Sequence, residues 1–233
     1  MKRRGRKGNS RMKKRIFFDQ DGTLIESGPG IKHCARKTLE KRRLPLIPYE
    51  ELDFFVGPPL RDCFRRCKVP EERIEEAVSD YREFYGTGNG KYDAKVFPGI
   101  FELLKKLKEE GNELYVATSK ADVLAKDIAT HFGFDGYFKQ FFGASLDGSH
   151  ALKQDILHRG LISTDASLPA VRIGDTYLDI EGANYNHIPS IGVSWGYGDD
   201  QKRGDTGALK VCVSTNELLS FLNQRKASDF KND

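Results

Sequence analysis

Two acidic residues separated by a single residue, Asp19 and Asp21, are the first feature of the sequence that points to chemistry. They follow an apolar run at residues 16–18, which predicts a short buried strand. Carboxylates at the end of a buried strand are costly when unpaired, and two so close together repel each other. A divalent cation is the usual way to keep both ionised. Gly22 then allows a sharp turn towards a ligand, although Asp and Gly also occur in ordinary turns.

The elements that must position these carboxylates are predicted by the second half of the chain. From Val96 onward, short apolar runs alternate with helical patterns. Repeated βαβ units of this kind predict an α/β fold with a doubly wound parallel sheet, in which a ligand binds beyond the carboxyl ends of the strands. After the first strand, further strands are predicted at residues 113–117, 138–143, 170–173, 190–193 and 211–213.

At the carboxyl ends of the predicted strands, acidic, hydroxyl and ammonium side chains are expected to lie together at one edge of the sheet. Such a set is what phosphoryl transfer needs, because the enzyme supplies a metal and donors for the phosphoryl oxygens. An aspartate can act as the nucleophile, so no Ser-His pair is required. The residues expected at this edge are Asp19, Asp21, Thr118, Ser119, Lys153, Asp175 and Asp179.

The segment between the first strand and Gly90 has a different character, because its patterns are helical throughout. Helices are predicted at residues 31–43, 49–55, 60–67 and 71–85. We therefore expect an all-α domain inserted into the α/β core. The predicted division is a basic leader at 1–14, an α/β core at 15–26 and 91–233, and a helical cap at 27–90.

The net charge and the cysteine content limit the classes of function that the chain can have. The net charge of +4 includes nine basic residues and no acidic residue in positions 1–15, so residues 16–233 carry −5. We interpret residues 1–14 as a disordered, solvated basic tail rather than a nucleic-acid arm, because no basic stripe with aromatic residues follows it. Four cysteines without CxxC spacing indicate reduced thiols. With no apolar run long enough to span a bilayer and no signal peptide, a cytoplasmic protein is expected.

The chain resembles haloacid-dehalogenase-like phosphatases in the order and kind of four motifs. These motifs are FFDQDGTL at 17–24, LYVATSK at 114–120, Lys153, and IGDTYLDIEGA at 173–183. The resemblance covers nearly the whole chain from Arg15, including a helical cap after the first motif. Within that superfamily the sequence looks like the phosphoglycolate-phosphatase-like branch, and FVGPPL at 55–60 looks like a group in that branch assigned as 5′-nucleotidases.

The resemblance implies a role for each of these residues. Asp19 would attack phosphorus and form an aspartyl-phosphate, and Asp21 would protonate the leaving oxygen and then activate water. One Mg²⁺ would be held by Asp19, the Asp21 carbonyl oxygen and Asp175. Asp179 would complete the acidic site directly, through a water or through Lys153. The residues expected to bind phosphoryl oxygens are Thr118 and Lys153, with backbone amides of Gly22, Thr23 and Ser119 assisting.

The substrate is left open by the sequence. Gln154 follows Lys153 where phosphoglycolate phosphatases usually have Pro, and Gln20 stands between the aspartates where an apolar residue is commoner. Lys120 rivals Lys153 as the phosphate lysine, and Trp195 and Tyr197 either stack on a base or line a loop. Arg61, at the predicted start of a cap helix, either binds a substrate carboxylate or second phosphate or belongs to a plain helix start.

Several functions therefore remain as alternatives. The leading expectation is a monomeric or homodimeric phosphatase acting on a small phosphorylated metabolite such as phosphoglycolate. A 5′-nucleotidase acting on nucleoside monophosphates is the first alternative, and a phosphosugar mutase, which shields the aspartyl-phosphate from water, is the second. An inert binding module with a basic nucleic-acid arm is the non-enzymatic alternative, and the full acidic set argues against it.

Overall fold

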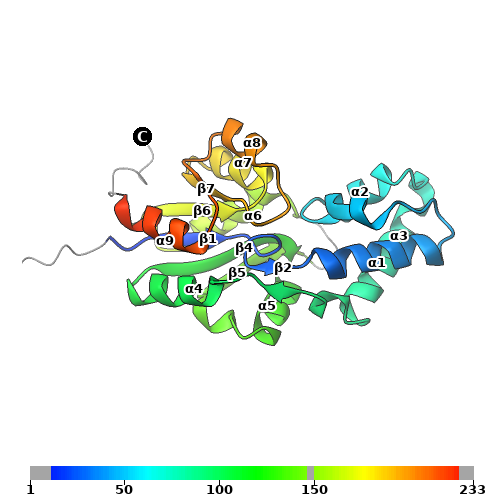
Figure 1. Cartoon of the computed structure of the whole chain (residues 1–233), viewed down its shortest axis with the longest axis horizontal. Coiled ribbons are helices and arrows are strands. Elements are labelled where there is room, and N and C mark those ends of the chain that lie inside the picture. The colour runs from blue at the N-terminus through cyan, green and yellow to red at the C-terminus, as the bar shows by residue number, and fades with distance from the viewer. Residues whose placement is uncertain (1–11, 146–149, 226–233) are drawn as a thin grey trace, which may run out of the picture.

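A six-stranded parallel sheet forms the centre of the α/β part of the molecule, in a computed structural model that describes residues 12–145 and 150–225 (Figure 1). The strand order β5-β4-β1-β6-β7-β8 places β1 between β4 and β6. The predicted doubly wound α/β fold is thereby confirmed. The strands are β1 (Arg15–Phe18), β4 (Glu113–Ala121), β5 (Gln140–Ala144), β6 (Ala170–Gly174), β7 (Ser190–Val193) and β8 (Val211–Cys212).

Helices cover both faces of the sheet because both faces of its strands are apolar. In β1, Ile16 and Phe18 join the core beneath α4, α5 and α9, whereas Phe17 packs into a second core with residues of α6 and α7. The helices of the α/β part are α4 (Ile100–Glu109), α5 (Asp122–His131), α6 (Lys153–Ile162), α7 (Tyr177–Tyr185), α8 (Asp200–Asp205) and α9 (Thr215–Gln224). A short 3₁₀ helix, η3 (Asp135–Tyr137), precedes β5.

Between β1 and β4 the chain leaves the sheet and forms the inserted helical region, at the right of Figure 1. Its elements are α1 (Gly28–Lys41), η1 (Tyr49–Phe55), α2 (Leu60–Arg66), α3 (Glu71–Gly86) and η2 (Gly90–Tyr92). All four predicted helical segments are present, the second of them as a 3₁₀ helix. The division into domains at residues 27 and 90 stays a prediction, and of the predicted leader only residues 12–14 are described.

The two chain crossings into and out of the helical region pair with each other. Strands β2 (Ile25–Glu26) and β3 (Lys95–Val96) form a small antiparallel sheet. Two residues are too few for a recognisable alternating pattern, so this pairing was not predicted from the sequence. Within the described residues, no helix is long and apolar enough to cross a membrane.

Strand β4 is longer than its apolar run predicts. It continues from Ala117 to Ala121, and its register against β5 shifts between these two residues. An irregularity of this kind redirects side chains and is common beside functional sites. The shifted segment holds Thr118, Ser119 and Lys120, which come from the second motif.

Candidate active site

The carboxyl end of β1 places Asp19 at the centre of the sheet edge. The Asp19 backbone N–H donates to the Ile173 carbonyl of β6 at 2.8 Å, which continues the strand pairing by one residue. The Asp19 side chain is only 3% exposed, and one of its oxygens accepts from the Gln20 backbone N–H at 2.9 Å. Asp19 therefore has a fixed orientation at the point where two neighbouring strands end.

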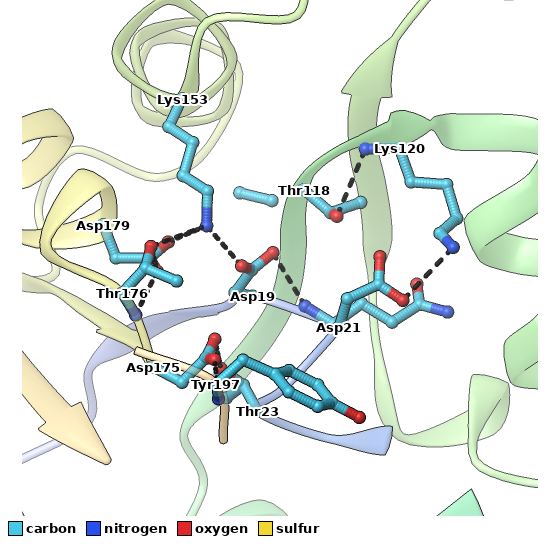
Figure 2. A network of polar contacts seen from close by, with 12 residues as sticks. Asp19, Asp21, Thr23, Thr118, Lys120, Lys153, Asp175, Thr176, Asp179 and Tyr197 are labelled. Atoms are coloured by element: carbon cyan, nitrogen blue, oxygen red, sulfur yellow. Dashed lines mark hydrogen bonds and ion pairs between the residues drawn. The ribbon is translucent and has the colours of Figure 1, made fainter. Parts of the chain in front are cut away.

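Lys153, the first residue of α6, lies against Asp19 although the two are far apart in the sequence (Figure 2). Its Nζ pairs with Asp19 Oδ2 and with Asp179 Oδ1, the latter at 2.7 Å. Burial alone would lower the pKa of Lys153, but Asp179 and Asp19 together raise it above its ordinary value. The ammonium therefore stays protonated and bridges two carboxylates.

Asp179 is held more tightly than any other carboxylate of this cluster. Its oxygens accept from Thr176, through the backbone N–H at 3.1 Å and the hydroxyl at 2.8 Å, as part of a capping box for α7. Arg172, from β6, contacts it at 2.6 Å. Burial alone would raise the pKa of Asp179, but Lys153 and Arg172 hold it well below its usual range. Asp179 is therefore ionised, and its oxygens already have several partners.

Asp175, which follows β6, is buried with weaker partners. Its oxygens accept from the Thr23 hydroxyl at 3.2 Å and the Tyr197 backbone N–H at 2.9 Å. Burial, together with the nearby Asp179 carboxylate, raises the pKa of Asp175 to about 7. Burial also raises the pKa of Asp19, even though Lys153 acts in the opposite direction. Burial therefore disfavours the ionised form of both carboxylates.

The acidic residues fit a hard divalent cation. Asp19, Asp175 and Asp179 each offer an oxygen, and these three atoms lie within 4.8 Å of one another. The two cations in contact with them, Lys153 and Arg172, both pair with Asp179. Carboxylate oxygens are the ligands that Mg²⁺ prefers, and a bound cation would offset the repulsion felt by Asp19 and Asp175.

Gly22 makes the approach of Asp175 possible. Its φ of +77° lies in the left-handed region, and a Cβ at this position would stand 2.1 Å from Asp175 Oδ2. The backbone therefore turns as the sequence predicts, and the absence of a side chain lets the two strand ends meet.

Thr118 and Ser119 lie at the end of β4 and line a cavity of about 320 Å³ together with Asp19, Asp21 and Lys153. Thr118 is 2% exposed, and its hydroxyl oxygen accepts from the Lys120 backbone N–H at 3.3 Å. The structure thus brings the residues predicted from four separate motifs to one edge of the sheet. Lys120 lies beside Asp21 instead of Asp19, with its Nζ 3.1 Å from Asp21 Oδ1.

The far side of this cavity belongs to the helical region and is mainly apolar. The side chains that face it from α1, η1 and α3, and from the turn before α2, include Ile31, Phe55, Pro58, Val78, Tyr81 and Tyr85. Two arginines, Arg61 and Arg82, also line it. Arg61 already pairs with Glu75, one hydrogen bond being 3.0 Å long.

Trp195 and Tyr197 follow β7 and tie that loop to the start of the inserted region. The Trp195 indole N–H donates to the Thr23 carbonyl at 3.0 Å, and the Tyr197 hydroxyl accepts from the Gly28 backbone N–H at 2.6 Å. Of the two roles considered for them, lining the loop is the one that these contacts favour.

Arg172 belongs to this cluster of side chains but was not among the residues predicted from the sequence. It is 2% exposed in the middle of β6, and it also donates to the Ala117 carbonyl at 2.6 Å. The signal was present, because an arginine inside the apolar run AVRIG must find an anionic partner if that run is a buried strand.

Comparisons with known proteins agree with this geometry. The family model for haloacid dehalogenase-like hydrolases matches residues 16–193. A 5′-nucleotidase from Pseudomonas aeruginosa is 39% identical over 209 residues, 89% of this chain and 94% of that protein. The tyrosine-protein kinase PtkA from Mycobacterium tuberculosis is 37% identical over 211 residues, 89% of this chain and 72% of that protein. A solved structure of a predicted phosphatase from Clostridium acetobutylicum matches with a TM-score of 0.85 and 35% identity, covering 92% of this chain and 100% of that one.

Proposed function

The chain belongs to the haloacid dehalogenase-like hydrolase family and is a phosphatase, and we propose that it hydrolyses nucleoside 5′-monophosphates with Asp19 as nucleophile and Mg²⁺ as cofactor. The observation that carries the substrate class is the cavity of about 320 Å³, whose outer wall consists mainly of apolar and aromatic side chains. A flat nucleobase gains from packing against such a wall, whereas phosphoglycolate offers it only a single methylene group. The similarity to a protein named 5′-nucleotidase supports the same choice.

In this proposal the reaction begins at Asp19. Its carboxylate attacks phosphorus and displaces the nucleoside oxygen, which takes a proton from Asp21. Asp21 then accepts a proton from the water that cleaves the aspartyl-phosphate. Because Asp19 is buried and held by the Gln20 N–H and Lys153, its attacking oxygen is oriented before the substrate arrives.

The remaining residues of the site bind the phosphoryl group and neutralise negative charge. Lys153 offsets the charge of Asp19 and Asp179, and Thr118 and the Ser119 backbone face the cavity where phosphoryl oxygens would lie. We propose Asp19, Asp175 and the Asp21 carbonyl oxygen as the Mg²⁺ ligands, with Asp179 acting through Lys153. A bound Mg²⁺ would supply positive charge to the phosphoryl oxygens in the transition state.

Phosphoglycolate is the second candidate substrate, and a specific observation favours it. Arg61 and Arg82 line the cavity wall opposite Asp19, where a second anionic group of a small substrate would point. Arg61 would first have to exchange its partner Glu75 for that group. This requirement makes phosphoglycolate the weaker proposal.

Phosphate release from the purified chain tests the proposal. We expect a nucleoside 5′-monophosphate to have a kcat/KM at least tenfold above that of phosphoglycolate, and EDTA to abolish release until Mg²⁺ is restored. We also expect Mg²⁺ to raise the melting temperature of the protein and to lose this effect in Asp175→Asn. A preference for phosphoglycolate, or release that survives EDTA, would contradict the corresponding part of the proposal.

A further inference from the structure

Lys120 occupies a place at the site that the mechanism above does not use. It ends the shifted segment of β4, and its side chain is 9% exposed. Its Nζ lies 3.1 Å from Asp21 Oδ1, whose own side chain is 11% exposed. Of the cations in the described part of the chain, Lys120 is the one that pairs with Asp21, whereas Lys153 and Arg172 serve the carboxylates on the other side of the site.

The same ammonium group also contacts the helical region. Lys120 Nζ donates a hydrogen bond to the Tyr85 hydroxyl and lies 4.3 Å from the centroid of the Tyr85 ring. Tyr85 belongs to the last turn of α3, is 5% exposed, and stacks on Tyr81 with ring centroids 5.6 Å apart. Lys120 therefore contacts a residue of the sheet edge and a residue of the inserted helices at once.

We propose that Lys120 is a positioning residue for Asp21. Through its contact with Tyr85, it also couples the orientation of the Asp21 carboxylate to the position of α3. The ammonium donates a hydrogen bond to the Tyr85 hydroxyl and pairs with Asp21 through its charge, since Asp21 Oδ1 has no hydrogen-bond partner among the described residues. If Lys120 were absent, the largely buried Asp21 carboxylate would lose its cation and would turn towards water instead of the cavity. The inference rests on the proposed phosphatase mechanism, in which Asp21 transfers the proton.

The geometry argues against a direct role of Lys120 at the phosphoryl group. Figure 2 shows Lys153 and Lys120 on opposite sides of the pair formed by Asp19 and Asp21. Lys153 contacts Asp19, where phosphorus must be attacked, whereas Lys120 reaches away from it to Asp21 and Tyr85. A residue placed in this way acts on the proton-transfer step through Asp21.

A comparison of leaving groups tests this inference. A nucleoside monophosphate has a poor alkoxide leaving group that needs a proton, whereas 4-nitrophenolate leaves almost without one. We expect Lys120→Met to lower kcat/KM for the nucleoside monophosphate by roughly 10- to 100-fold, part of the 10²–10⁴ that general acid–base catalysis supplies. For 4-nitrophenyl phosphate we expect a loss of kcat/KM below about threefold. The comparison uses kcat/KM because this ratio covers the steps up to departure of the leaving group and excludes the later hydrolysis of the aspartyl-phosphate, which both substrates share.

Two further variants sharpen the test. Lys37→Met is the matched control. Lys37, on α1, lies 4.3 Å from the ring centroid of Phe84, which precedes Tyr85 on α3, and it contacts no active-site residue among those described. It should leave both rates unchanged. Lys120→Arg keeps the positive charge but replaces the compact ammonium by a larger, planar guanidinium. We therefore expect the same selective loss for the nucleoside monophosphate, but of only about fivefold. This variant also carries the test if Lys120→Met does not fold.

The coupling to α3 has its own measurement, which does not depend on activity. In thermal unfolding, Lys120→Met and Tyr85→Phe should be non-additive, with the double variant losing less melting temperature than the two single losses together. Additive losses would overturn the coupling. Equal losses of kcat/KM for both substrates, or no loss for either, would overturn the positioning role. If the unaltered chain hydrolyses no phosphate monoester, the proposed function fails and this catalytic role fails with it.

Discussion

The guanidinium of Arg172 lies 2.6 Å from the Asp179 carboxylate, and both side chains are almost completely buried. Lys153 contacts the same Asp179 oxygen at 2.7 Å. Two cations thus converge on one carboxylate, and both also pair with Asp19, Arg172 at the longer distance of 3.7 Å. Asp175 instead accepts from the Thr23 hydroxyl and the Tyr197 backbone N–H. The arrangement explains how Lys153 stays protonated and fixed in a buried position, and why the site as a whole suits a metal cation.

Loss of Arg172 should destabilise the fold. Arg172→Met leaves the buried Asp179 carboxylate with one cation fewer. Removing one partner of a buried ion pair lowers the free energy of unfolding by about 3–5 kcal/mol. The free energy of unfolding in urea measures this. Arg36→Met removes an exposed pair with Glu40 and should cost less than about 1 kcal/mol. If the two variants had the same free energy of unfolding, the pairing of Arg172 with Asp179 would not be a major contribution to stability.

The sequence predicted the sheet and its strand-end residues well, because both depend on short-range patterns. Apolar runs separated by helical patterns identify βαβ units, and the rule for parallel sheets then brings Asp19, Asp175 and Lys153 to one edge. The helical region was also predictable, since its apolar residues recur with helical spacing. The family assignment is confirmed, whereas the roles of the individual site residues remain proposals.

What the sequence could not predict depends on long-range packing. The contact of Lys120 with Tyr85 joins β4 to the end of α3, 35 residues earlier in the chain, and no local pattern specifies it. The Lys120–Asp21 pair is of the same kind. Lys120 appeared in the sequence only as a rival for binding phosphate, because a lysine beside a phosphate motif gives no indication of which carboxylate it faces.

Gly22 provides a test of how closely the two strand ends must approach. In Gly22→Ala a Cβ would meet Asp175, so we expect phosphate release to fall by at least tenfold as Asp175 is displaced. Gly133→Ala is the matched control, because its φ of +78° is nearly the same as the +77° of Gly22 but nothing lies within 4 Å of its added Cβ. It should cost only about 1–2 kcal/mol of left-handed strain and leave catalysis intact. Equal activity in both variants would argue against the close approach.

Gln20 is expected to reduce stability rather than contribute to it. It is fully buried, and neither its amide oxygen nor its amide nitrogen has a hydrogen-bond partner among the described residues. Replacing an unsatisfied polar group by an apolar one of similar length removes its desolvation cost. Gln20→Met should therefore raise the free energy of unfolding by about 1 kcal/mol, against no change for Gln140→Met at an exposed position. A loss of stability in Gln20→Met would mean that the amide has a partner in solution.

The thiols should be inert in the folded protein. Cys34, Cys63, Cys67 and Cys212 are buried, and burial raises the pKa of Cys63 to about 12 and that of Cys34 to about 11. Raising the pKa lowers the thiolate fraction at any given pH, so alkylation at pH near 8 should be on the order of 100-fold slower in the folded chain than in urea. The rate should rise as the pH approaches these raised values. Rapid reaction of one thiol in the folded chain at neutral pH would show that it is exposed.

The central claim is that Asp19 becomes phosphorylated during turnover. Acid quenching of the enzyme with its best substrate, followed by borohydride reduction, converts an aspartyl-phosphate into homoserine, which tandem mass spectrometry locates in the chain. We predict homoserine at position 19, none at Asp21 or Asp175, and none anywhere in Asp19→Asn, which should release no phosphate. Homoserine at another aspartate, or phosphate release by Asp19→Asn at the rate of the unaltered chain, would contradict the mechanism.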